Sequence, residues 1–185
     1  MNNELLRIYQ ILKDHEKDDF RQFYTSGFQA EGLYGCCGQC TVFPFVQMLK
    51  VDSGLFKYAS GFCAGEGQMG QYPCGAFNGG ILVLSYLFGR DIEQTQSDID
   101  FSKTYFRNTC RLVREFEKRF KTVFDDVLCK NVQHKIFGRS FMMLDSEDYA
   151  VFEQMGGHVD KCTNVVGTSA RIIARIIYEE LDRML

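Results

Sequence analysis

The stretch "GAFNGGILVLSYLFG", residues 75–89, is the most apolar part of the chain. Its apolar side chains surround the helical axis instead of forming one stripe, and a helix of that kind is buried on all sides. We therefore predict a central buried helix over Ala76–Phe88, with Gly89 as its C-terminal cap. Alanine and glycine make its first turns thin, so another backbone or a cofactor can approach closely.

Helical patterns also occur on both sides of this segment. Residues 102–124 and 166–181 each place large apolar side chains on one stripe, opposite a charged face. Residues 3–24 show a looser pattern, which predicts an extended N-terminal helix. A shorter helix is predicted over 41–50, where Pro44 can be accommodated in the first turn.

The remaining segments are predicted to be irregular. Residues 25–40 are rich in glycine and predict a loop, and residues 130–158 carry several glycines without a clear period. No long stretch alternates apolar and polar residues as a half-buried strand does. We therefore predict an all-α fold, a single-domain helical bundle over residues 1–185.

Composition limits the classes of function. The 185 residues carry a net charge of -3, so no basic field is present to hold nucleic acid. The longest strongly apolar stretch, Ile81–Phe88, is too short to span a bilayer, and the charged first residues do not resemble a signal peptide. We expect a cytoplasmic protein that does not span the membrane. Because cytosolic thiols stay reduced, the eight cysteines are not expected to form a structural disulfide framework.

A glycine pattern precedes the central segment. Gly65–Gly70, "GEGQMG", has the G-x-G-x-x-G spacing of dinucleotide-binding loops. That motif follows a strand and opens a helix, whereas "LFKYASGFCA" before it has no run of β-branched residues. We therefore interpret it as a turn and predict no nucleotide binding.

Two cysteine features can carry chemistry. Cys74 precedes the central helix, where free N–H groups and the helix dipole stabilise a thiolate, although a buried cysteine can also be inert. Cys37 and Cys40 form a C-x-x-C pair that could exchange disulfides or hold a metal. His158 lies four residues before Cys162, so the two could share a helix face as ligands.

The segment "CGAFNG", Cys74–Gly79, fits the C-G-A-x-x-G motif, and other cysteines lie on either side of it. In this respect the chain resembles the C-GCAxxG-C-C family, whose members are described as redox-active, over about residues 35–183. The resemblance implies four characteristic cysteines, which match Cys40, Cys74, Cys129 and Cys162 here. The first lies in "CCGQC", so Cys37 competes with Cys40. Cys36, Cys63 and Cys110 are additional.

The resemblance implies a redox function but no specific reaction. In one interpretation Cys40, Cys74, Cys129 and Cys162 bind an iron–sulfur cluster or another soft metal, since thiolates suit both, and the protein transfers electrons. In another, Cys74 is a reactive thiolate that Cys40 or Cys37 resolves, and no cofactor is needed. The third is a non-catalytic, partner-binding helical domain. Family members are often encoded near transporters, which implies a redox partner protein, and a homo-oligomer is compatible with the sequence.

Overall fold

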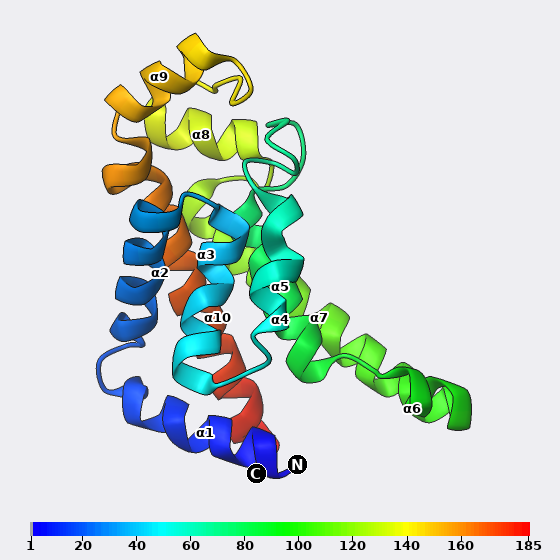
Figure 1. Cartoon of the computed structure of the whole chain (residues 1–185). Helices are drawn as coiled ribbons and strands as arrows, with labels where there is room; N and C mark the ends of the chain where they lie inside the picture. Colours follow the sequence, from blue (N-terminus) through cyan, green and yellow to red (C-terminus); the bar gives the residue numbers. More distant parts are fainter. Residues whose placement is uncertain (1) are drawn as a thin grey trace.

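The central helix α5 (Gly75–Phe88) lies in the middle of the computed structural model, which describes residues 2–185. The helix α3 (Cys37–Pro44) packs closely against it (Figure 1). A Cβ on Gly79 would lie 2.5 Å from the carbonyl oxygen of Gly38, so only glycine permits this approach. The predicted all-α bundle with a central buried helix is confirmed.

The other long helices complete the core around α5. The helix α2 (Arg21–Tyr34) packs along α10 (Cys162–Arg183), and α7 (Ile99–Phe124) packs against both α5 and α10. The remaining elements are α1 (Asn3–Glu16), α4 (Gly54–Tyr58), α6 (Ile92–Ser97), α8 (Cys129–Phe137), α9 (Ser146–Gln154), a 3₁₀ turn (Ala59–Phe62) and two π-helical turns (Phe45–Leu49 and Gly157–Lys161).

The two ends of the bundle differ. The helix α1 and the C-terminal end of α10 lie together at one end, whereas α8 and α9 cover the other (Figure 1). The short α6 and the beginning of α7 project from the body. Within the described residues, no helix is both long enough and apolar enough to cross a bilayer.

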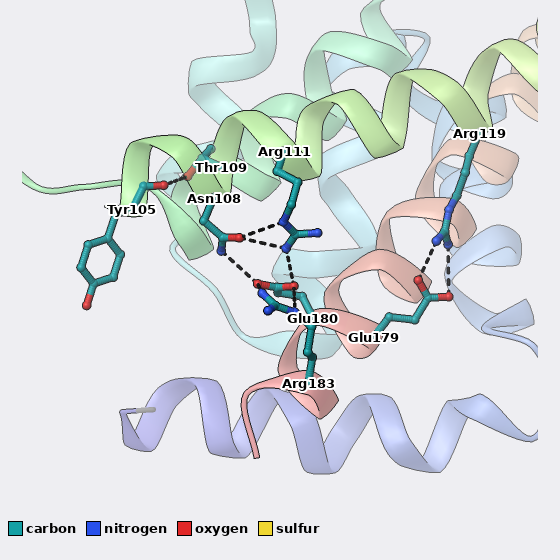
Figure 2. Close-up of polar contacts among 8 residues, drawn as sticks. All are labelled: Tyr105, Asn108, Thr109, Arg111, Arg119, Glu179, Glu180 and Arg183. Atoms are coloured by element: carbon teal, nitrogen blue, oxygen red, sulfur yellow. Dashed lines mark hydrogen bonds and ion pairs between the residues drawn. The ribbon is translucent and has the colours of Figure 1, made fainter. Parts of the chain in front are cut away.

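A buried ionic cluster connects α7 to α10 near the end that carries the termini. Glu180 on α10 is 3% exposed and accepts hydrogen bonds from Arg111 (2.5 Å), Asn108 (3.0 Å) and Arg183 (2.6 Å), as Figure 2 shows. Burial alone would raise the pKa of Glu180, but the hydrogen bonds from Arg183, Arg111 and Asn108 outweigh it and lower the pKa. The cluster therefore holds a buried carboxylate in its charged form.

The N-terminal segment differs from the sequence-based prediction. Residues 3–24 form parts of two helices, because Asp19 and Phe20 adopt left-handed conformations between the end of α1 at Glu16 and the start of α2 at Arg21 (φ 56° and 55°). The buried Phe20 side chain anchors this turn in the core. Residues 25–40 are mostly helical and not a loop, since Gly27 allows α2 to contact the Cβ of Ala170 on α10.

Two further boundaries were also predicted incorrectly. The helix expected over 41–50 begins at Cys37, so Pro44 is its last residue and a π-helical turn follows. The segment 130–158, predicted to be irregular, contains most of α8 and all of α9. Gly138 ends α8 in a left-handed conformation, and the side chain of Asp145 caps α9.

Candidate redox site

A cavity of about 70 Å³ lies between the beginnings of four helices. Cys37 and Cys162 are the first residues of α3 and α10, Cys129 is the first residue of α8, and Cys74 is the N-cap of α5. All four cysteines line this cavity. The N-termini of α3, α5 and α8 therefore meet around four thiols, and the dipoles of these helices favour negative charge there, whereas α10 continues directly from a π-helical turn.

Backbone pairing brings two of these helix starts together. The amide of Cys74 donates to the carbonyl oxygen of Val127 at 2.7 Å, and the amide of Cys129 donates to that of Tyr72 at 2.9 Å. The segments that lead into α5 and α8 therefore run antiparallel, with an isolated bridge between Pro73 and Leu128. This pairing places Cys74 and Cys129 on the same wall of the cavity.

Cys37 and Cys74 are neighbours in the cavity wall, because a Cβ on Gly75, the residue after Cys74, would overlap the Cys37 sulfur. The interaction with Cys74 raises the pKa of Cys37 well above its ordinary value, and burial adds to the effect. The Cys37 sulfur also accepts a hydrogen bond from the amide of Ala64 at 3.4 Å. Two neighbouring thiols can form a disulfide without a large movement of the backbone.

The other two thiols are held in a dry environment. Burial raises the pKa of Cys129 to about 12, and the proximity of Cys37 adds to it. Burial likewise raises the pKa of Cys162, with further contributions from Cys37 and Glu31. Both thiols are therefore protonated at neutral pH, unless a bound group takes the place of their protons.

A carboxylate and a histidine form another part of the cavity wall. Glu31 on α2 is 2% exposed, and its Oε2 has no hydrogen-bond partner. Burial raises the pKa of Glu31, whereas a hydrogen bond with Cys40 and the charge of His158 oppose the increase. The Nε2 atom of His158 lies 3.8 Å from Glu31 Oε1, and its Nδ1 atom lies 2.6 Å from Glu153 Oε1. Sequence analysis did not identify Glu31, which lies in the segment predicted to be a loop.

Residues 35–176 match the family model described as "Putative redox-active protein (C_GCAxxG_C_C)". The chain belongs to this family. No curated protein and no solved structure matches it. The resemblance identified from the "CGAFNG" motif is thus confirmed, and the described function of this family is redox activity.

Three of the four cysteines that the family resemblance implied line the cavity, namely Cys74, Cys129 and Cys162. The fourth, Cys40, is fully buried one helical turn after Cys37 and is not among the lining residues. Burial raises the pKa of the Cys40 thiol, and the charge of Glu31 adds to the shift. In this C-GCAxxG-C-C protein, Cys37 of the C-x-x-C pair therefore lies at the cavity, whereas Cys40 lies near Glu31.

The additional cysteines of this family member lie in two places. Cys36 and Cys63 form a disulfide with a Cα–Cα distance of 5.2 Å, which the sequence analysis did not anticipate. Cys63 lines the same cavity as the four thiols. Cys110 is on α7, beside Phe106 in a surface groove.

The G-x-G-x-x-G segment forms a turn next to the cavity, as the sequence predicted. Five consecutive residues, 64–68, have positive φ values between 46° and 73°. Three of these residues carry side chains, for which the left-handed region is unfavourable. A 3₁₀ turn precedes the segment and α5 begins only at Gly75, so the arrangement of strand, loop and helix that binds a dinucleotide does not occur here.

The arrangement of possible ligand side chains bears on the predicted metal site. Within residues 2–185, no three His, Cys, Asp or Glu side chains are arranged to hold a metal ion. His158, which could have shared a helix face with Cys162, is instead paired with Glu153.

Proposed function

We propose that this protein is a thiol–disulfide redox protein in which Cys37 and Cys74 are the redox couple. The observation that carries this proposal is the position of the two thiols in one cavity, where the Cys37 sulfur lies against Gly75, the residue after Cys74. Cys74 caps a helix of 14 residues, a position that favours a thiolate. The raised pKa of Cys37 keeps this thiol protonated until it resolves the mixed disulfide.

The reaction is a two-step exchange with a disulfide of a redox partner protein. The Cys74 thiolate attacks one sulfur of the partner disulfide, forming a mixed disulfide and releasing one partner thiol. The Cys37 thiol then loses its proton and attacks Cys74, which forms the Cys37–Cys74 disulfide and releases the second partner thiol. The pair loses two electrons and two protons, and the partner disulfide gains them. Dithiol chemistry of this kind suits a cytoplasmic location, where thiols are kept reduced.

A second function, electron transfer by a soft metal or an iron–sulfur cluster, is favoured by a different observation. Four thiols around one cavity provide the donors for an anionic thiolate cluster, and the three at the N-termini of α3, α5 and α8 lie at the positive ends of helix dipoles. Cys37, Cys74, Cys129 and Cys162 would hold the group, with Cys40 as the alternative to Cys37. When bound, the group would supply one-electron redox chemistry, and the thiols would lose their protons to it.

Oxidation and metal analysis of single variants test the two functions. The anaerobically purified protein is analysed for metal and acid-labile sulfide, then oxidised with glutathione disulfide and mapped by peptide mass spectrometry. The dithiol function predicts a Cys37–Cys74 disulfide, lost in Cys37→Ser and Cys74→Ser but kept in Cys129→Ser and Cys162→Ser. The cluster function predicts instead that all four substitutions lower metal content by similar amounts.

Two variants serve as matched controls. Cys110→Ser changes a cysteine away from the cavity and should alter neither result. Cys40→Ser distinguishes the two cysteines of the C-x-x-C pair, since it should leave the Cys37–Cys74 disulfide intact. A protein without metal in which Cys37 and Cys74 never pair would contradict both functions.

A further inference from the structure

The disulfide between Cys36 and Cys63 lies directly beside the proposed dithiol. Cys37 follows Cys36 in the chain, and its sulfur accepts a hydrogen bond from the amide of Ala64, the residue that follows Cys63. The Cys37 sulfur is therefore adjacent, in sequence or in space, to both half-cystines. No other free cysteine has contacts of this kind with both sides of the disulfide among residues 2–185.

Three of these cysteines lie around the same cavity. Cys63 lines it together with Cys37 and Cys74. Cys36 is 8% exposed, whereas Cys63 is partly exposed, so an oxidant reaches the disulfide at Cys63 more readily than at Cys36. Cys63 also begins the left-handed turn over residues 64–68, a strained backbone of the kind that concentrates at functional sites.

The cellular compartment gives a second argument. In a reducing compartment such as the cytoplasm proposed above, disulfides are rare, and those that occur are usually catalytic or redox-sensing. A disulfide that reaches the cavity through Cys63, next to the Cys37 thiol, suits exchange better than it suits a static crosslink.

We propose that Cys36–Cys63 is a second redox couple, which exchanges with Cys37 and Cys74 and makes the cavity wall an internal disulfide relay. The inference rests on the proposed dithiol function, because it needs Cys37 and Cys74 to form a disulfide. It adds an entry point, Cys63, through which oxidising equivalents reach the more deeply enclosed Cys74.

The relay consists of two exchange steps, each of which breaks one S–S bond and forms one. In the first, Cys37 loses its proton and attacks the Cys63 sulfur, forming Cys37–Cys63 while the Cys36 sulfur leaves and takes up a proton. In the second, the Cys74 thiolate attacks Cys37, forming Cys37–Cys74 and releasing Cys63 as a thiol. One disulfide and one dithiol exchange places, so no external reactant is consumed.

Disulfide mapping of fully reduced protein, oxidised with glutathione disulfide and quenched at intervals, tests this order. Cleavage after Glu66 separates the peptide that contains Cys63 from the one that contains Cys74. Fragmentation between residues 36 and 37 then identifies which of the two adjacent cysteines carries each bond. In the wild type we expect Cys36–Cys63 to form first and Cys37–Cys74 to replace it.

Two variants interrupt the relay at different steps. Cys63→Ser removes the entry point and should slow formation of Cys37–Cys74 by about tenfold or more, because the enclosed pair must then react with glutathione directly. Cys74→Ser removes the final acceptor and should accumulate the Cys37–Cys63 intermediate. Cys110→Ser is the matched control for loss of a cysteine. Circular dichroism of each variant shows whether its helices are retained.

The outcomes separate this inference from the function on which it rests. Formation of Cys37–Cys74 at the wild-type rate in Cys63→Ser, together with only Cys36–Cys63 in Cys74→Ser, would overturn the relay and leave the dithiol function intact. Absence of Cys37–Cys74 from the wild type as well would overturn both. If Cys74→Ser does not fold, the rate in Cys63→Ser decides alone.

Discussion

Gly75 lies directly against the Cys37 sulfur, because the first turn of α5 packs closely against the first turn of α3. A Cβ on Gly75 would overlap this sulfur and would lie 2.9 Å from the amide nitrogen of Gly38. The backbone neighbour of Cys74 therefore sets the distance between the two proposed redox thiols. Glycine at the second position of the C-G-A-x-x-G motif thus has a steric role in the site.

We expect Gly75→Ala to destabilise the protein by about 1–3 kcal/mol, because the added methyl group forces two packed helix starts apart. It should also slow formation of the Cys37–Cys74 disulfide. Chemical denaturation and disulfide mapping measure the two effects. Gly61→Ala is the control, since nothing lies within 4 Å of a Cβ at that position. Equal stability of the two variants would contradict this account of the contact.

A second glycine of α5 tests the packing at a distance from the thiols. We expect Gly79→Leu to prevent folding or to reduce helix content strongly, because even a Cβ there would lie 2.5 Å from the carbonyl oxygen of Gly38 and 3.1 Å from the Cβ of Thr41. Far-ultraviolet circular dichroism and thermal unfolding measure the result. A folded variant with wild-type stability would show that α3 and α5 can separate freely.

Glu31 should make stability decline as pH rises. Burial raises the pKa of this carboxyl above its unfolded value of 4.5, so the folded protein binds the proton more tightly. The resulting stabilisation is fully present below that value and is lost as pH rises through the folded pKa. Glu31→Gln, which cannot ionise, should therefore gain stability relative to the wild type on going from about pH 4 to about pH 8.

Denaturant unfolding across this pH range measures the effect of Glu31→Gln. Glu147→Gln on α9 is the control, because Glu147 is exposed. If the difference in unfolding free energy between Glu31→Gln and the wild type stays constant with pH, Glu31 is not a destabilising buried charge.

Glu180 should have the opposite pH dependence. Its hydrogen bonds with Arg183, Arg111 and Asn108 lower its pKa, so its stabilisation is present above the unfolded value and is lost as pH falls through the folded pKa. We expect Glu180→Gln to cost about 1–3 kcal/mol at neutral pH and to reduce the loss of stability in acid.

The same unfolding measurements test Glu180→Gln. Glu117→Gln, which affects only an exposed pair with Lys121, is the control and should cost much less. If Glu180→Gln lowers the free energy of unfolding no more than Glu117→Gln does, the buried cluster does not stabilise the α7–α10 contact.

The sequence predicted elements whose burial could be recognised from a single segment. α5 was evident because its apolar side chains surround the axis, and the last helix was evident from its stripe. α2 was not, because Gly27 was interpreted as a turn residue when it serves a close contact with α10. That contact joins residues far apart in the sequence, and no local pattern contains it.

The site could also be predicted only in part, because local motifs identify some of its residues and distant contacts position the others. The family motif identified Cys74, and the order of cysteines identified Cys129 and Cys162 as candidates. The orientation of Cys37 and Cys40 depends on where α3 begins, and the sequence analysis had placed that boundary at residue 41. Glu31 and the Cys36–Cys63 disulfide depend on how α2 and the turn at 64–68 meet the cavity, which only the tertiary structure defines.

α1 and the C-terminal end of α10 lie at one end of the bundle and α8 and α9 at the other (Figure 1), and the cavity of Cys37, Cys74 and Cys129 is lined by Val132 of α8 and Tyr149 of α9. α10 begins at Cys162 beside the cavity and runs to the end where α1 also lies. A domain, an affinity tag or an electrode linker joined to either end of the chain would thus leave the cysteine-bearing end uncovered. The same orientation allows this bundle to be fused to a larger oxidoreductase through either terminus without covering the end at which the cavity lies.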